Sequence, residues 1–244
     1  MDNQREQFSL KPRTPNKHLL EMTPNPDTKR AVVFGATGMV GKELINALLE
    51  NNDYESIIAV VRKQLIITDP KLKQIKLSDF SKLMDLRDKL KAGVFFCSIG
   101  TTIKTAGSKE EFARVDLEIP KNIARLAESL SIPSFVAISS IGADANSSNF
   151  YLKTKGEMEK AVRDIYHGNL KFVRPSLLMG NRDEFRFGEK VSVAFMKGFG
   201  WLFAGPLKKY RGIYAHDVAH AMIKISDHSG DKMIYESDEL QRLV

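Results

Sequence analysis

The stretch that most constrains this chain is a short apolar run that leads through glycines into a helical pattern. RAVVFGATG, from Arg30, is typical of a strand, and MVGKELINALLEN, from Met39, has apolar residues at helical spacing. Gly35 and Gly38 end the first stretch and Gly41 lies near the start of the second, so the glycines are spaced GxxGxxG rather than GxGxxG. A strand, a tight glycine turn and a helix N-terminus together offer free N–H groups to a pyrophosphate. We therefore predict that this turn binds a dinucleotide, and a turn that serves packing alone is the less favoured alternative.

Strand-like and helix-like stretches alternate through the rest of the chain. Continuous apolar strands that alternate with helices predict a parallel sheet covered on both faces, an α/β, Rossmann-like doubly wound fold. Pro120 is expected at a kink or in the first turn of a helix. Further strands are predicted at 56–62, 73–79, 93–100, 133–140 and 170–176, and helices at 79–92, 108–130 and 151–166.

The two ends of the chain differ from this pattern. Residues 1–28 hold four of the nine prolines and no apolar period, which predicts a flexible N-terminal extension. Residues 29–244 are then expected to form a single NAD(P)-binding Rossmann domain. Within it, the irregular stretch 181–212 is rich in Phe, Gly, Lys and Arg, and it is predicted to form a small C-terminal substrate lid.

Composition excludes several other classes of protein. The net charge of +7 is a mild excess that favours a phosphorylated cofactor or an acidic partner, and without a dense basic block nucleic acid is an unlikely partner. No apolar run approaches the ~20 residues of a membrane span. The lone cysteine, Cys97, is expected to be a small buried hydrophobe. With no disulfide and no apolar leader, we expect a cytoplasmic protein. No residues have metal-ligand spacing, so no metal is predicted.

The end of the second predicted strand indicates which nucleotide is preferred. A chain that prefers NAD often carries an acid here to hold the ribose 2′-hydroxyl. This chain has Arg62 and Lys63 instead, in AVVRKQ, and their charges would attract a 2′-phosphate. We therefore predict NADP(H), with NAD(H) less likely, while two ordinary surface charges remain the alternative.

A tyrosine and a lysine four positions apart, Tyr151 and Lys155, fall in the predicted helix YLKTKGEMEKAVRDIY. At this spacing they share one helix face. A free tyrosine has a pKa near ~10, and a nearby ammonium favours the phenolate. A serine pair, Ser139 and Ser140, ends the preceding predicted strand. The four residues together suggest proton transfer to a carbonyl.

These motifs resemble an atypical short-chain dehydrogenase/reductase, in particular the Tat-interacting protein (CC3) oxidoreductase group. The resemblance rests on GATGMVG, FFCSIGTT, ISSIGADANSSNFYLKTKGEMEKAV and VRPSLL, and it runs from about residue 29 to about residue 236. It implies a Ser140–Tyr151–Lys155 triad, with Ser139 left open as the alternative serine. The predicted cofactor contacts are Gly35, Thr37, Gly38, Met39, Val40, Gly41, Arg62, Lys63, Ser98, Gly100, Thr101, Thr102, Tyr151, Lys155, Arg174 and Pro175.

The sequence thus predicts an NADP(H)-dependent oxidoreductase that transfers hydride on a small carbonyl or alcohol substrate. The alternative is an NADP(H)-binding regulatory or sensor protein, which would act on a protein partner through its N-terminal extension. A nucleotide-sugar epimerase or reductase relative is less favoured, because only about 70 residues follow the sixth predicted strand.

Overall fold

The computed structural model describes residues 29–180 and 211–244. Its larger sheet has seven parallel strands in the order β3-β2-β1-β4-β5-β6-β9. A two-stranded parallel sheet joins β7 to β8. The strands are β1 (Lys29–Phe34), β2 (Tyr54–Val61), β3 (Leu72–Lys76), β4 (Val94–Cys97), β5 (Ser134–Ile138), β6 (Asn169–Arg174), β7 (Leu178–Met179), β8 (Ile213–Tyr214) and β9 (Ile234–Glu236).

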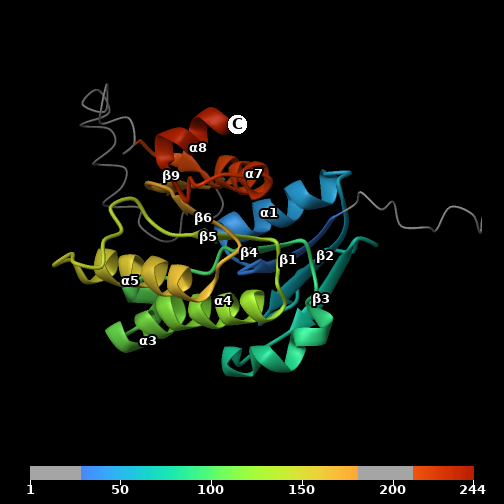
Figure 1. Cartoon of the computed structure of the whole chain (residues 1–244), viewed down its shortest axis with the longest axis horizontal. Helices are drawn as coiled ribbons and strands as arrows, with labels where there is room; N and C mark the ends of the chain where they lie inside the picture. The colour runs from blue at the N-terminus through green and yellow to red at the C-terminus, as the bar shows by residue number, and fades with distance from the viewer. Residues whose placement is uncertain (1–28, 181–210) are drawn as a thin grey trace, which may run out of the picture.

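Helices cover both faces of the larger sheet (Figure 1). Helices α1, α7 and α8 lie on one face, and α3, α4, α5 and the 3-10 helix η2 lie on the other. This arrangement confirms the predicted α/β, Rossmann-like fold. The helical segments are α1 (Met39–Glu50), η2 (Phe80–Lys89), α2 (Ile103–Ala106), α3 (Lys109–Ala113), the π-helical turn η3 (Arg114–Glu118), α4 (Ile119–Ser129), α5 (Phe150–Ile165), α7 (Ala215–Ser226) and α8 (Ser237–Leu243).

Strand β1 shows how one apolar run builds both cores. Its side chains alternate between the two faces because successive residues of a strand point in opposite directions. Ala31 and Val33 join the core beneath α1 and α7, whereas Val32 and Phe34 join the core formed with η2, α4 and α5. All four are fully buried. Burying a valine or phenylalanine side chain stabilises the fold by about 1.5–3 kcal/mol.

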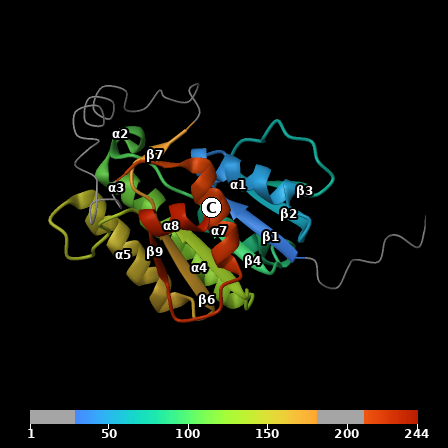
Figure 2. The same cartoon turned by 90° about the horizontal axis from the view of Figure 1, so that it is seen from above.

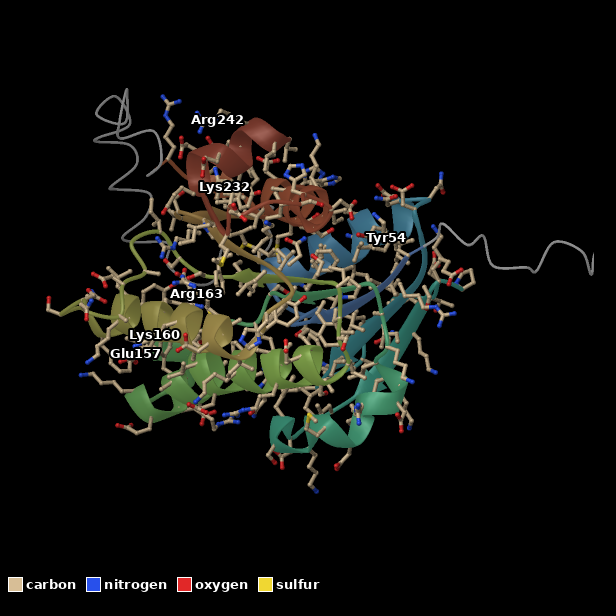
Figure 3. All side chains as sticks on the ribbon, in the orientation of Figure 1. Tyr54, Glu157, Lys160, Arg163, Lys232 and Arg242 are labelled. Atoms are coloured by element: carbon tan, nitrogen blue, oxygen red, sulfur yellow. The ribbon has the colours of Figure 1, made fainter. Side chains whose placement is uncertain are left out.

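Helix α5 has one buried side and one exposed side. Met158 and Val162 are buried against the sheet. Lys160 and Arg163 are exposed, and Figure 3 labels both on this helix. The helix is therefore held against the sheet by its apolar side.

The direction of chain progression reverses at β1. Strands β2 and β3 lie on one side of β1, and β4 with the later strands lies on the other. The loops that leave the carboxyl ends of β1 and β4 therefore diverge and open a crevice between them. Phe34 and Cys97 end these two strands, so the glycine turn and the stretch after Cys97 meet there.

Two predicted helices take other forms. The one expected at 79–92 is the 3-10 helix η2, in which Phe80 and Leu83 are buried. Their three-residue spacing matches the three residues per turn of this form. The one expected at 108–130 is divided into α3, η3 and α4, and Pro120 lies in the first turn of α4. Proline lacks the N–H that would continue the hydrogen-bond ladder, so a break is favoured there.

The remaining points concern β9, the chain ends, Cys97 and a membrane span. Strand β9 was not predicted, since three residues are too short for an alternating pattern to show. The predicted extension at 1–28 and nearly all of the predicted lid at 181–212 lie outside the described residues. A single domain over 29–244 therefore stays a prediction. Cys97 is buried, as expected, and burial raises the pKa of its thiol to about 12. Among the described residues, no helix is long and apolar enough to cross a membrane.

The turn between β1 and α1 depends on close backbone contacts. Gly35 has a φ of +85°, and a Cβ there would lie 2.7 Å from the carbonyl carbon of Ser98. A Cβ on Gly41 would lie 2.1 Å from the carbonyl oxygen of Gly35. Only glycine fits both positions, so the first turn of α1 packs directly on the end of β1.

We expect Gly41→Ala to destabilise the protein by about 1–3 kcal/mol, the usual cost of forcing extra volume into a packed site. Urea unfolding monitored by circular dichroism measures this change. Gly93→Ala is the matched control, because its Cβ would meet Arg30 O at an ordinary 3.7 Å. Equal losses in the two variants would contradict the packing argument.

Candidate functional site

A cleft of about 900 Å³ opens at the carboxyl ends of the central strands. The loops after β1, β2, β4 and β5 form most of its walls, and α2 and β7 also contribute to its lining. Figure 2 shows α2 and β7 at the same end of the sheet. This volume lies within the roughly 300–1,000 Å³ common for small-molecule and cofactor sites. The predicted cofactor residues that line it are Gly35, Thr37, Gly38, Met39, Val40, Arg62, Ser98, Gly100, Thr101, Thr102, Tyr151 and Lys155.

The N-terminus of α1 is suited to an anion. Its N-cap residue is Gly38, which offers no side-chain acceptor, and the first turn contains no acidic residue. Among the described residues no side chain caps the N–H groups of this turn, and the helix dipole adds about half a positive charge. Met39 and Val40, the first two residues of the helix, line the cleft here. These features fit the pyrophosphate of a dinucleotide.

Tyr151 and Lys155 come from the first two turns of α5 and line the same cleft. Asn149 begins the helix, because its side chain accepts the N–H of Leu152 at 3.2 Å. The Tyr151 ring is half-buried, and its centroid lies 5.6 Å from that of Phe112. Lys155 is only 3% exposed. The two side chains therefore share the cleft that the glycine turn opens.

A buried carboxylate, Asp116, holds Lys155. Its Oδ1 lies 2.7 Å from the Lys155 Nζ, and its Oδ2 accepts the Thr101 N–H at 2.9 Å. Burial raises the pKa of Asp116, while Lys155 opposes that rise. Burial alone would lower the pKa of Lys155, but Asp116 and then Tyr151 outweigh it and the net direction is upward. Lys155 is therefore an ammonium at neutral pH.

Sequence reasoning missed Asp116. It lies in η3, and a π-helical turn cannot be read from apolar spacing. Such turns occur frequently at functional sites. The stretch 108–130 was predicted only to be helical, and Asp116 is one of several charged residues in it, so the sequence did not single it out.

The structure distinguishes the two serines at the end of β5. Ser139 lines the cleft and is 5% exposed, and its Oγ has no hydrogen-bond partner among the described residues. Ser140 does not line the cleft, and its Oγ donates to the Ile141 carbonyl at 3.3 Å. Of the two alternatives, Ser139 is thus the one that faces the site, and the role predicted for Ser140 has no support from this geometry.

Other predicted contacts also lie outside the cleft lining, namely Gly41, Lys63, Arg174 and Pro175. Gly41 instead makes the close packing of α1 possible. The Arg174 guanidinium is bound by Glu159 of α5 at 2.6 and 2.8 Å and by Glu236 of β9 at 3.2 Å. It joins the helix to the sheet edge, and a cofactor role for Arg174 stays a prediction.

Further polar and apolar groups line the cleft beyond the predicted residues. Ser78 and Phe80 follow β3, and Glu111 and Arg114 come from α3 and η3. Together with Arg62 they line the end of the cleft beyond the second strand. No group of three metal-ligating side chains occurs within residues 29–180 and 211–244.

The fold and this cleft define a nucleotide-binding protein of the Rossmann type. The chain belongs to the NAD dependent epimerase/dehydratase family, whose sequence profile matches residues 31–236. Protein HTATIP2 of Rattus norvegicus is 32% identical over 170 residues, which cover 68% of this chain and 70% of that protein. Protein FMP52-1, mitochondrial, of Scheffersomyces stipitis is 28% identical over 223 residues, covering 87% of this chain and 97% of that one. These relatives confirm the resemblance to the Tat-interacting protein group.

Solved structures share the same fold. The ADP-L-glycero-D-manno-heptose-6-epimerase of Helicobacter pylori superposes with a TM-score of 0.65 at 18% identity, covering 88% of this chain and 80% of that one. MoeE5 in complex with UDP-glucose and NAD superposes with a TM-score of 0.62 at 16% identity, covering 86% and 79%. At these identities the likeness establishes the fold alone.

The expected cytoplasmic location is wrong on this comparison. FMP52 relatives from Debaryomyces hansenii, Scheffersomyces stipitis and Meyerozyma guilliermondii are named mitochondrial. The expectation rested on a single cysteine and on the lack of an apolar leader. A single cysteine bears on the redox state and not on the compartment, so it does not identify the cytoplasm.

We expect Asp116→Asn to destabilise the protein by about 3–5 kcal/mol at pH 7, because it leaves a buried ammonium without its counter-charge. In the native protein the pKa of Lys155 is higher in the folded state than in the unfolded state. The ion pair therefore contributes its full free energy of stabilisation below the unfolded-state pKa of about 10.4, and this contribution is lost as pH rises through the folded-state pKa. In the variant, burial pushes the Lys155 pKa down, so its penalty shrinks as the lysine loses its proton. The difference between the proteins should therefore be smaller at pH ~10 than at pH 7.

Urea unfolding at both pH values measures this. Glu118→Gln is the matched control, since Glu118 also lies in η3 but pairs with Lys121 at the surface. Exposed pairs contribute little, so the control should lose little stability. A loss in Asp116→Asn that does not change with pH would contradict the assignment of the penalty to the ammonium.

Proposed function

We propose that this protein is an NADP(H)-dependent oxidoreductase that interconverts a small carbonyl compound and its alcohol. The observation that carries the proposal is that Tyr151 and Lys155 line the same cleft as the glycine turn at the N-terminus of α1. The proposal is supported by membership of a family described as NAD dependent. A nicotinamide nucleotide bound in this cleft supplies or accepts the hydride.

In this mechanism the side chains manage the proton and the substrate oxygen. The Tyr151 hydroxyl donates a proton to the carbonyl oxygen during reduction and takes it back during oxidation. The Lys155 ammonium, held by Asp116, offers its remaining N–H donors to ribose hydroxyls and stabilises negative charge near the phenol. Ser139, whose Oγ has no partner among the described residues, is suited to hydrogen-bond the same substrate oxygen.

The preference for a phosphorylated nucleotide is supported by the charges beside the second strand. Arg62 follows the last residue of β2 and lines the cleft, at the position where nucleotide-binding folds meet the adenosine ribose. No acid stands directly after this strand to hold an unphosphorylated 2′-hydroxyl. Lys63 is exposed and lies outside the cleft lining, so the preference rests on Arg62.

A small substrate is favoured over a nucleotide sugar. Among the described residues, α7 and α8 cover the sheet and β9 extends its edge, and Leu178 is the one residue after β6 that lines the cleft. The complex of MoeE5 with UDP-glucose concerns a protein that is similar in fold only. A substrate that occupies the space near Ser139, Tyr151 and Leu178 need not carry a nucleotide.

We expect Tyr151→Phe to bind NADPH as the native protein does and to lose turnover by a factor of about 10² or more, since a general acid contributes on that scale. Fluorescence titration with NADPH measures binding, and NADPH oxidation with a panel of aldehydes and ketones measures turnover. Unchanged turnover would refute the role of the phenol. Binding without turnover on any carbonyl, in the native protein, would favour the alternative of a nucleotide-binding sensor.

The two serines allow a matched comparison. Ser139→Ala should lower turnover yet leave the free energy of unfolding equal or slightly raised, because a buried hydroxyl without a partner contributes no hydrogen bond. Ser140→Ala should leave turnover close to native. Urea unfolding and the same carbonyl assay measure both. The reverse pattern, with Ser140→Ala the inactive variant, would restore the assignment first made from the sequence.

A further inference from the structure

Building on the proposed NADP(H) function, we propose that Arg114 is a second residue that binds the adenosine 2′-phosphate, and that Glu111 limits its availability. The two residues would then tune the choice between a phosphorylated and an unphosphorylated nucleotide. From the sequence, the preference for NADP(H) was predicted from Arg62 and Lys63 alone.

The geometry brings the three charged residues to one end of the cleft. Arg62 follows β2, Glu111 comes from α3 and Arg114 from η3, and all three line the cleft. Arg62 lies close enough to Glu111 to lower the pKa of its carboxyl, after the larger effect of Arg114. A phosphate bound beside Arg62 would therefore also lie near the other two side chains.

Arg114 is held by Glu111 in this structure. Its Nε donates to Glu111 Oε2 at 2.7 Å, and a terminal nitrogen donates to Oε1 at 2.5 Å. The two donors are parallel, which is the arrangement in which a guanidinium also binds a phosphate. Hydrogen bonding to Arg114 lowers the pKa of Glu111, so the carboxyl is ionised at neutral pH.

The pair can exchange partners at little cost. The side chains of Arg114 and Glu111 are 55% and 41% exposed, and ion pairs as exposed as this contribute little to stability. A phosphate with a charge near −2 attracts a guanidinium more strongly than a carboxylate does. Arg114 would turn to the phosphate when one is present and stay with Glu111 when it is absent. Glu111 would meanwhile repel the phosphate, which makes it the residue that weakens NADP(H) binding.

The test measures nucleotide affinity in the full chain by calorimetry, with NADPH, NADH, 2′,5′-ADP and 5′-AMP as probes. Arg114→Gln should weaken binding of NADPH and 2′,5′-ADP about tenfold, the scale of one lost charge-assisted contact, and change NADH and 5′-AMP little. Glu111→Gln should strengthen binding of the two phosphorylated probes only, because it frees Arg114 and removes a negative charge. Arg125→Gln is the control, since Arg125 is an exposed arginine of α4 that contacts Asn122 outside the cleft lining.

Each outcome separates this inference from the proposed function. Equal weakening of phosphorylated and unphosphorylated probes by Arg114→Gln would overturn the inference, as would unchanged or weaker NADPH binding in Glu111→Gln. In both cases, binding of NADPH by the native protein would still support the proposed function. A native protein that binds none of the four probes would overturn both.

Discussion

A lysine ammonium buried in a protein requires a counter-charge, and much of the site depends on how Lys155 obtains one. Asp116 lies 2.7 Å from the ammonium, and its second oxygen accepts the N–H of Thr101. One carboxylate thus joins α5, the π-helical turn η3 and the loop after β4. Leaving this buried ammonium without its counter-charge would cost several kcal/mol of stability. The ion pair therefore fixes the three segments relative to one another, in addition to their apolar packing.

The cleft lining combines two kinds of chemistry. The N-terminus of α1, Arg62 and Arg114 contribute positive charge, which suits phosphates. Ser139, Tyr151 and Lys155 contribute a hydroxyl, a phenol and an ammonium, the groups on which the proposed proton transfer rests. Both groups line one cavity, and the turn between them depends on the close contacts of Gly35 with Ser98 and of Gly41 with Gly35. The acids in the cleft, Asp116 and Glu111, are each paired with a base.

The sequence predicted the elements whose signals are local and periodic. The glycine turn, the apolar strands and the Tyr151–Lys155 spacing each depend on residues close in the chain, and the structure places them as expected. The sequence did not predict the division of the helix at 108–130, the short strand β9 or the position of Asp116. These depend on partners far along the chain: Lys155 lies 39 positions beyond Asp116, and β9 pairs with β6 across α7.

What the sequence determined by itself is therefore the alternation of strands and helices from β1 to β6, the glycine turn between β1 and α1, and the family. Period, glycine spacing and short motifs are written in consecutive residues, so no tertiary contact is needed to read them. Only the tertiary structure decided which of two adjacent serines faces the cleft, which carboxylate holds the lysine, and that Arg174 is bound by Glu159 and Glu236. Side-chain direction at a strand end and the pairing of buried charges follow from how separate elements pack, and that packing is not encoded in any one stretch of the chain.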